Sequence, residues 1–87
     1  MNHTPSNANE LTMTLYLLTR RDDVDHGEAE AQAIIAADID EARRLAMRDL
    51  SKPQQVSWLD LQRSSCIPIT SVATHDARHV LTAYAPG

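Results

Sequence analysis

The segment from Ala33 to Ala46, AIIAADIDEARRLA, constrains the fold most, because it permits either one long helix or a strand followed by a helix. In one continuous helix, Asp38 would lie about 40° from Ala42, inside the apolar stripe, where burying a carboxylate is costly. If a strand instead ends at Ala37, Asp38 becomes the N-cap of a new helix and Glu41 completes a capping box. The segment therefore predicts a strand followed by a helix.

This helix is expected to run from residue 39 to about residue 50. Pro53 is expected to stop it, because proline disfavours helical geometry in the residue before it. The residues that recur at helical spacing predict a buried stripe made of Ile39, Ala42, Leu45, Ala46 and Leu50. Residues 30–37, just before the helix, are predicted to form a strand.

Three further segments have the character of strands. Residues 11–19 alternate with a period of two, and Leu18 on the otherwise polar face indicates that this face is partly covered too. Residues 66–73 are predicted to form a strand that Pro68 places at an edge or a bulge, and residues 79–85 are predicted to form the last strand. Between residues 54 and 65 we expect a short turn or helical piece, from which Trp58, Leu59 and Leu61 cover one end of the core.

The order of these elements predicts an α+β fold. A small antiparallel sheet in the order β-β-α-β-β would have one main helix packed on one face. Eighty-seven residues suit one domain with a modest core, here residues 11–87. Residues 1–10 are polar and rich in turn-forming residues, so they are predicted to be a disordered tail.

The composition excludes several classes of function. With 12 acidic and 8 basic residues the net charge is -4, which argues against general nucleic-acid binding. Gly27 and Gly87 are the only glycines, so no phosphate-binding loop or dinucleotide fingerprint can be built, and no cofactor is predicted. A single cysteine, Cys66, favours the cytoplasm, and no segment approaches the ~18 apolar residues of a membrane span.

The segment from residue 20 to residue 30 is the candidate partner-binding site. Read as an EF-hand loop from Asp22, it has Gly27 at the sixth position, but Val24, His26 and Ala33 stand where calcium ligands are needed. The segment is therefore a solvated acidic loop or a face that binds basic groups of another protein. Its charged residues are Arg20, Arg21, Asp22, Asp23, Asp25, Glu28 and Glu30.

Two alternatives to a binding module remain open. His75, Asp76 and His79 resemble part of a zinc site that lacks a ligand, and Cys66 is either a nucleophile or a small buried hydrophobe, so a small metal-dependent enzyme is one alternative. The other is a structural homo-oligomer, such as a homodimer, in which an exposed edge strand pairs with its symmetry mate.

The pieces TLYLLTR (14–20) and DEARRLA (40–46), followed by Trp58-x-Asp60, give the chain a family resemblance. Residues 13–87 resemble small, mostly uncharacterised phage- and prophage-associated proteins. The resemblance implies a mobile-element setting, in which short acidic proteins often bind and block a host protein. It also implies that residues 1–12 are either an extension or the result of an upstream start. The resulting hypothesis is a non-enzymatic, anti-CRISPR-like inhibitor of a host or defence protein.

Overall fold

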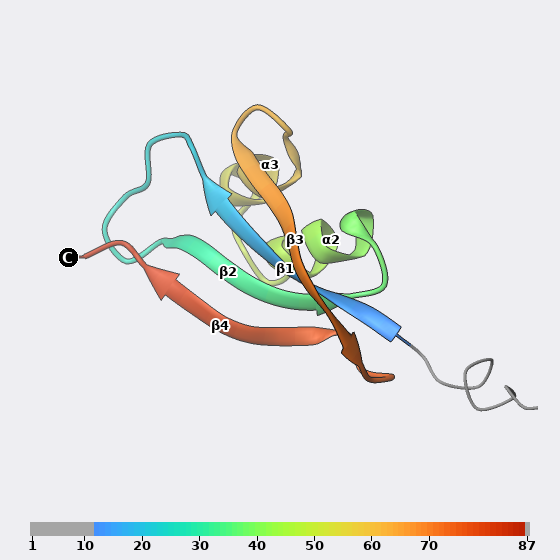
Figure 1. The fold of residues 1–87 in the computed structure, drawn as a ribbon. Helices are drawn as coiled ribbons and strands as arrows, with labels where there is room; N and C mark the ends of the chain where they lie inside the picture. Colours follow the sequence, from blue (N-terminus) through green and yellow to red (C-terminus); the bar gives the residue numbers. More distant parts are fainter. Residues whose placement is uncertain (1–11, 87) are drawn as a thin grey trace, which may run out of the picture.

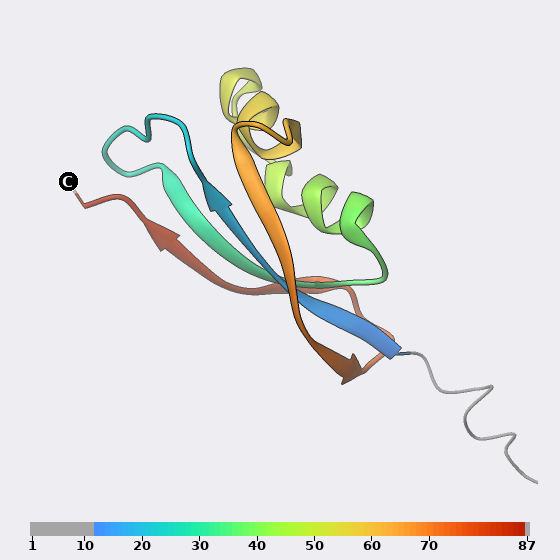
Figure 2. The same ribbon diagram turned by 45° about the horizontal axis from the view of Figure 1, so that its top comes forward.

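The computed structural model describes residues 12–86, in which a four-stranded antiparallel sheet carries two helices on one face (Figure 1, Figure 2). The strands lie in the order β3-β1-β2-β4. The predicted α+β class is confirmed, with a second helix besides the expected one, and the predicted tail over residues 1–10 lies outside the described part. The elements are β1 (Thr12–Arg20), β2 (Ala29–Ala36), α2 (Ile39–Met47), α3 (Lys52–Leu59), β3 (Ser64–Ala73) and β4 (Arg78–Tyr84).

Asp38 marks the predicted boundary between strand and helix. β2 ends at Ala36, Asp38 is extended, and its carboxylate accepts a hydrogen bond from the backbone N–H of Glu41 at 2.8 Å. The carboxylate of Glu41 in turn accepts from the N–H of Ala37 at 2.7 Å, one residue before the cap. Both bonds satisfy backbone donors where the chain enters the helix, so the two-element interpretation is confirmed.

The end of α2 differs from the prediction. The helix ends at Met47, about three residues early, because the backbone of Arg48 is extended, with ψ of 135°, and Asp49 is left-handed, with φ of 66°. The N–H of Leu50 donates to the carbonyl oxygen of Met47 at 3.3 Å, so the chain leaves α2 through a tight turn. Pro53 does not stop α2. It lies in the first turn of α3, where its missing N–H costs no hydrogen bond and its fixed φ suits a helix.

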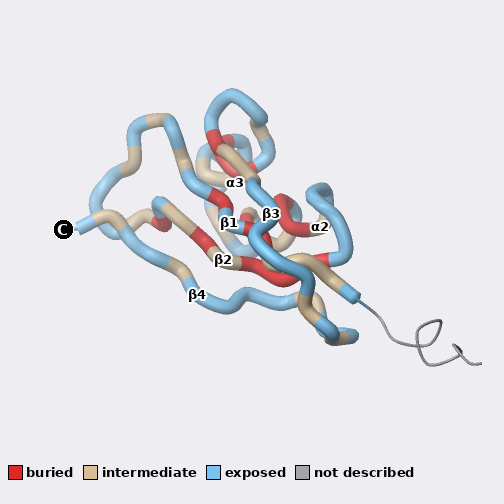
Figure 3. Tube along the Cα trace, viewed as in Figure 1, coloured by how far each residue is buried: buried red, intermediate tan, exposed pale blue. Residues whose placement is uncertain are grey.

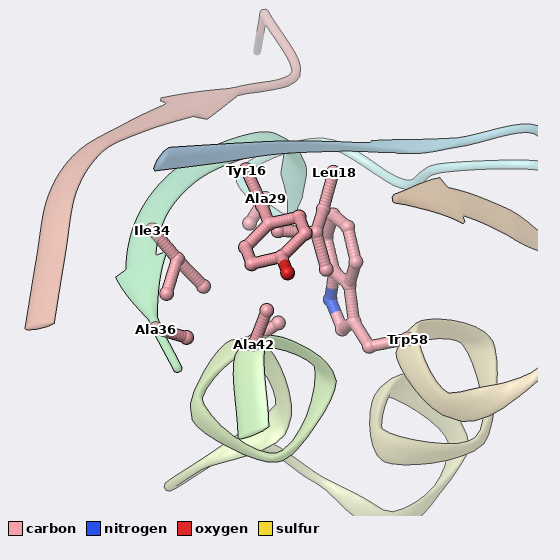
Figure 4. Close-up of a cluster of buried hydrophobic side chains, with 8 residues drawn as sticks. Tyr16, Leu18, Ala29, Ile34, Ala36, Ala42 and Trp58 are labelled. Atoms are coloured by element: carbon pink, nitrogen blue, oxygen red, sulfur yellow. The ribbon is translucent and has the colours of Figure 1, made fainter. Parts of the chain in front are cut away.

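The hydrophobic core lies between the sheet and the two helices. Leu18 of β1, Ile34 of β2 and Trp58 of α3 are fully buried there, with Tyr16 and Ala42 beside them (Figure 4). Trp58 covers the core as predicted. Leu59 and Leu61 do not cover the core, since they remain 45% and 70% exposed. Leu59 is the last residue of α3, and Leu61 follows the helix.

The pairing of β1 with β2 shows which face of β1 the helices cover. Tyr16 lies opposite Ile34, and both belong to the core below the helices, so the coverage that Leu18 indicated is confirmed. Leu17 lies opposite Ala33 and belongs to the other face, where none of the elements described for residues 12–86 packs (Figure 2). A strand places successive side chains on opposite faces, so neither helix covers the face containing Met13, Leu15 and Leu17. This face is open around Leu17, whereas Ile35, the partner of Leu15, is only 5% exposed.

The buried face of α2 also departs from the predicted stripe. Ile39, in the first turn, is 42% exposed, whereas Arg43 is only 6% exposed. The guanidinium of Arg43 donates to the carbonyl oxygen of Trp58 at 2.7 Å and to the hydroxyl and carbonyl oxygens of Ser64 at 2.8 and 3.1 Å. These three acceptors explain why a charged side chain fills a position between α2, α3 and β3.

The edges of the sheet carry the expected irregularities. β3, which contains Pro68, is an edge strand, and its pairing with β1 shifts register between Leu15 and Tyr16, so the predicted position of Pro68 is confirmed. β4 forms the other edge and pairs with β2 through two register shifts. Figure 3 shows both outer strands largely exposed.

Candidate partner-binding surface

Arg20 organises the acidic loop that joins β1 to β2. Its guanidinium donates to Asp22 Oδ1 at 2.8 Å, to Glu28 Oε1 at 3.1 Å and to the carbonyl oxygen of Asp23 at 2.8 Å. The side chain of Arg20 is 5% exposed, so these ion pairs are shielded from solvent on the arginine side. Charge-assisted hydrogen bonds of this kind are about twice as strong as neutral ones, so Arg20 fixes the path of the loop.

Contacts from other parts of the chain hold the loop as well. The hydroxyl of Ser57 in α3 donates to Asp22 Oδ2 at 2.6 Å, across 35 positions of sequence. The N–H of Gly27 donates to the carbonyl oxygen of Ala85, and the N–H of Ala85 donates to the carbonyl oxygen of Glu28. Gly27 has φ of 77°, which is unfavourable for other residues, so the glycine is needed for this turn.

The seven predicted site residues therefore separate into two groups. Arg20, Asp22 and Glu28 hold the loop together and have little charge left to offer a partner. The other four, Arg21, Asp23, Asp25 and Glu30, are exposed. Ser57 was not predicted for this region, because a lone serine in the sequence gives no indication that it will meet Asp22.

The candidate metal residues do not meet in one place. No group of three or more His, Cys, Asp and Glu side chains that could hold a metal occurs within residues 12–86. His75 and Asp76 lie in the turn between β3 and β4, whereas the ring of His79 forms a 2.8 Å hydrogen bond with Gln32 Oε1. The buried amide of Gln32 also donates to the carbonyl oxygen of Ala46, so His79 belongs to a link between the sheet and α2.

This link borders a surface hollow of about 340 Å³ between the 27–29 segment, the C-terminal end of α2, α3 and β4. Gln32, Arg48, Gln54, His79 and Tyr84 are among its lining residues. Burial lowers the pKa of His79, and the nearby charge of Arg48 lowers it further, so the neutral imidazole is favoured. The hollow thus has a polar wall with one cationic side chain.

Cys66 lies in β3 and is half-buried. Its burial raises the pKa of the thiol, and the charge of Arg43 opposes this only in part. A raised pKa disfavours the thiolate, which is the nucleophilic form. The surroundings of Cys66 therefore favour the interpretation as a small hydrophobe beside the core.

Asp22 is expected to make the stability of the domain depend on pH. The hydrogen bond from Arg20 lowers the pKa of this carboxyl below its ordinary 3.8, and the bond from Ser57 lowers it further, with burial opposing both. A carboxyl whose pKa is lower in the folded state stabilises that state above the unfolded pKa, and this contribution is lost as the pH falls through the folded pKa. Asp22→Asn should therefore lower the free energy of unfolding by about 1–2 kcal/mol at pH 7, and the deficit should shrink on acidification.

Urea unfolding followed by the fluorescence of Trp58 at pH values from about 2 to 7 measures this dependence. Asp23→Asn is the matched control, since the Asp23 side chain is exposed and Arg20 contacts only its backbone. The free energy of unfolding of the control should stay within about 0.5 kcal/mol of that of the unmodified protein at every pH. A deficit for Asp22→Asn that is the same at every pH would contradict the assignment.

The comparisons with known proteins give no relative. No family model matches the chain, and no curated protein and no solved structure matches it either. Neither α2 nor α3, the helices described within residues 12–86, is long and apolar enough to cross a membrane. No matched relative therefore contributes to the functional argument, which depends on the sequence and the geometry of this chain.

Proposed function

We propose that this protein is a non-enzymatic protein-binding module that presents the loop between β1 and β2 to a basic surface of its partner. The observation that carries the proposal is the Arg20 network, which fixes the loop while Asp23 and Asp25 stay exposed. A loop that is ordered before binding loses little conformational entropy when it binds, so more of the contact energy appears as affinity. Exposed carboxylates then contribute through attraction to cationic groups.

The charge of the whole chain supports the same proposal. The net charge of -4 attracts a basic partner over a longer range than the loop alone and speeds their association. The resemblance of residues 13–87 to phage- and prophage-associated proteins supports a more specific role, the inhibition of a host or defence protein. In that role the loop would occupy a basic site that the partner uses for another ligand.

Removing charge from the exposed part of the loop and from Glu30 at the start of β2 tests the proposal. The variant Asp23→Asn, Asp25→Asn, Glu30→Gln keeps the shapes of three exposed side chains and leaves Arg20, Asp22 and Glu28 in place. We expect it to bind the partner about tenfold more weakly, because each exposed ion pair contributes up to about 1 kcal/mol. Capture from a bacterial host lysate would identify the partner, and titration of the purified partner would measure affinity.

A second variant controls for net charge. Asp40→Asn, Asp49→Asn, Asp76→Asn also removes three exposed carboxylates, all of them outside the loop. We expect this variant to bind nearly as tightly as the unmodified protein. Equal weakening of both variants would leave only general charge attraction, and equal capture of both at full strength would remove the loop from the binding surface.

A further inference from the structure

We propose that two copies of this chain associate face to face through the open side of the sheet. This inference concerns a surface other than the acidic loop and goes beyond the proposed function. Antiparallel sheets with one face in water normally carry polar side chains on that face. Here the open face is largely apolar, and such patches on a protein surface mark interaction sites.

The registers of the three strand pairs define the centre of this face. Ile67 of β3, Leu17 of β1, Ala33 of β2 and Leu81 of β4 lie side by side in one row across the sheet. The row contains no polar or charged side chain. Leu81 is 67% exposed, Ile67 is 51% exposed and Leu17 is 38% exposed, so a large apolar area faces solvent in the single chain.

The same face has both a ridge and a groove. A groove of about 180 Å³ runs between Leu17 and Leu81, with Ala31, Ala33, Gln32 and Ala83 as its other lining residues. An apolar cavity of about 150 Å³ holds a benzene molecule, so this groove has room for a leucine side chain. Leu81 lines this groove and is 67% exposed, so its side chain is available to enter the equivalent groove of a second copy.

A surface that carries both partners of a contact suits a two-fold dimer. In such an arrangement Leu81 of each copy enters the alanine-lined groove of the other, and the contact closes without leaving a free apolar face. Arg78, which pairs with Ile35 beside this row, is turned toward its own loop, where it donates to Thr74 Oγ1 and to the carbonyl oxygen of Asp76. No like charges therefore need to meet at the centre of the dimer.

The available area limits the strength of the dimer. Four strands spaced about 4.8 Å apart, with seven residues in β4 at about 3.4 Å each, span at most about 450 Å² per copy. Two copies together stay just below the ~1,000 Å² at which specific interfaces begin, so we expect a weak dimer with a dissociation constant of micromolar or above. Residues 1–11 offer little apolar surface that could serve as a cover instead, since Met1, Pro5, Ala8 and Leu11 are their apolar residues.

Sedimentation velocity and light scattering of the full chain, from about 1 µM to 1 mM, would test the dimer. Leu17→Lys and Leu81→Lys should each raise the dissociation constant by about 100-fold, because each dimer then holds two lysines against apolar surface. Leu61→Lys is the matched control, since Leu61 is as exposed as Leu81 but follows α3. It should leave the dissociation constant unchanged.

Circular dichroism and the fluorescence of Trp58 would establish that each variant is folded. Leu17 lies in a central strand, so its substitution separates contact through the face from pairing of edge strands. A dimer that persists in folded Leu17→Lys would overturn the proposal in favour of edge pairing. A monomer at every concentration would also overturn it, whether the face is then free, covered by residues 1–11 or kept for a different protein.

Discussion

Replacing Trp58 by alanine is expected to lower the free energy of unfolding by about 4 kcal/mol. The indole is fully buried and contacts the core formed by β1, β2 and α2 (Figure 4). Its removal loses the largest apolar side chain of the core and leaves a cavity that the small neighbours Ala42 and Ala46 cannot fill. A domain of this size is stable by about 5–10 kcal/mol, so the variant should be close to unfolding at room temperature.

Urea unfolding followed by far-ultraviolet circular dichroism measures the effect, because the substitution removes the only tryptophan. Leu59→Ala is the matched control, since Leu59 is the next residue of α3 and is 45% exposed. We expect Leu59→Ala to lower the free energy of unfolding by less than about 1 kcal/mol. Similar losses for the two variants would mean that Trp58 does not hold the core in the way described.

Arg43→Ala is expected to lower the free energy of unfolding by about 3 kcal/mol. The substitution leaves the carbonyl oxygens of Trp58 and Ser64 without the guanidinium that contacts them, in a region closed to water. The Ser64 hydroxyl still donates to the Trp58 carbonyl oxygen at 3.2 Å, which limits the loss. Arg43 joins α2, the end of α3 and the start of β3, so its loss should loosen both helices together.

Arg44→Ala controls for charge and helix propensity in the same turn. Arg44 is exposed, and alanine favours a helix. The free energy of unfolding of this variant should therefore stay within about 0.5 kcal/mol of that of the unmodified protein. Arg43→Lys keeps the charge but has no planar group to reach three acceptors, so it should recover only part of the loss. Urea unfolding with Trp58 fluorescence compares all three variants, and full recovery by lysine would show that charge alone is needed.

Much of the fold followed from local patterns in the sequence. The period of two predicts β1, and Asp38 followed by Glu41 predicts the boundary between β2 and α2, because a cap depends only on residues within one helical turn. The end of α2 was less predictable. The extended backbone of Arg48 and the left-handed backbone of Asp49 end the helix. Pro53 is compatible with either a stop or a start, so the sequence did not reveal that α3 begins there.

The candidate site was predicted as a list of charges without their pairing. The sequence shows five carboxylates after Arg20, but only the turn at Gly27 brings Glu28 back to the guanidinium that also binds Asp22. Ser57 joins this network from another helix. Which carboxylates are left for a partner is therefore a property of the folded chain.

The sequence by itself determined the strands, the capped helix, the excess of acid and the position of the exposed loop. These depend on interactions between residues a few positions apart, whose geometry the chain fixes locally. Only the tertiary structure decided that α2 and α3 cover the Tyr16 and Leu18 face of β1, that Arg43 is buried, and that the row through Leu17 and Leu81 stays open. Both faces of β1 are apolar enough to be buried, so the choice depends on how distant elements pack together, which no local pattern records.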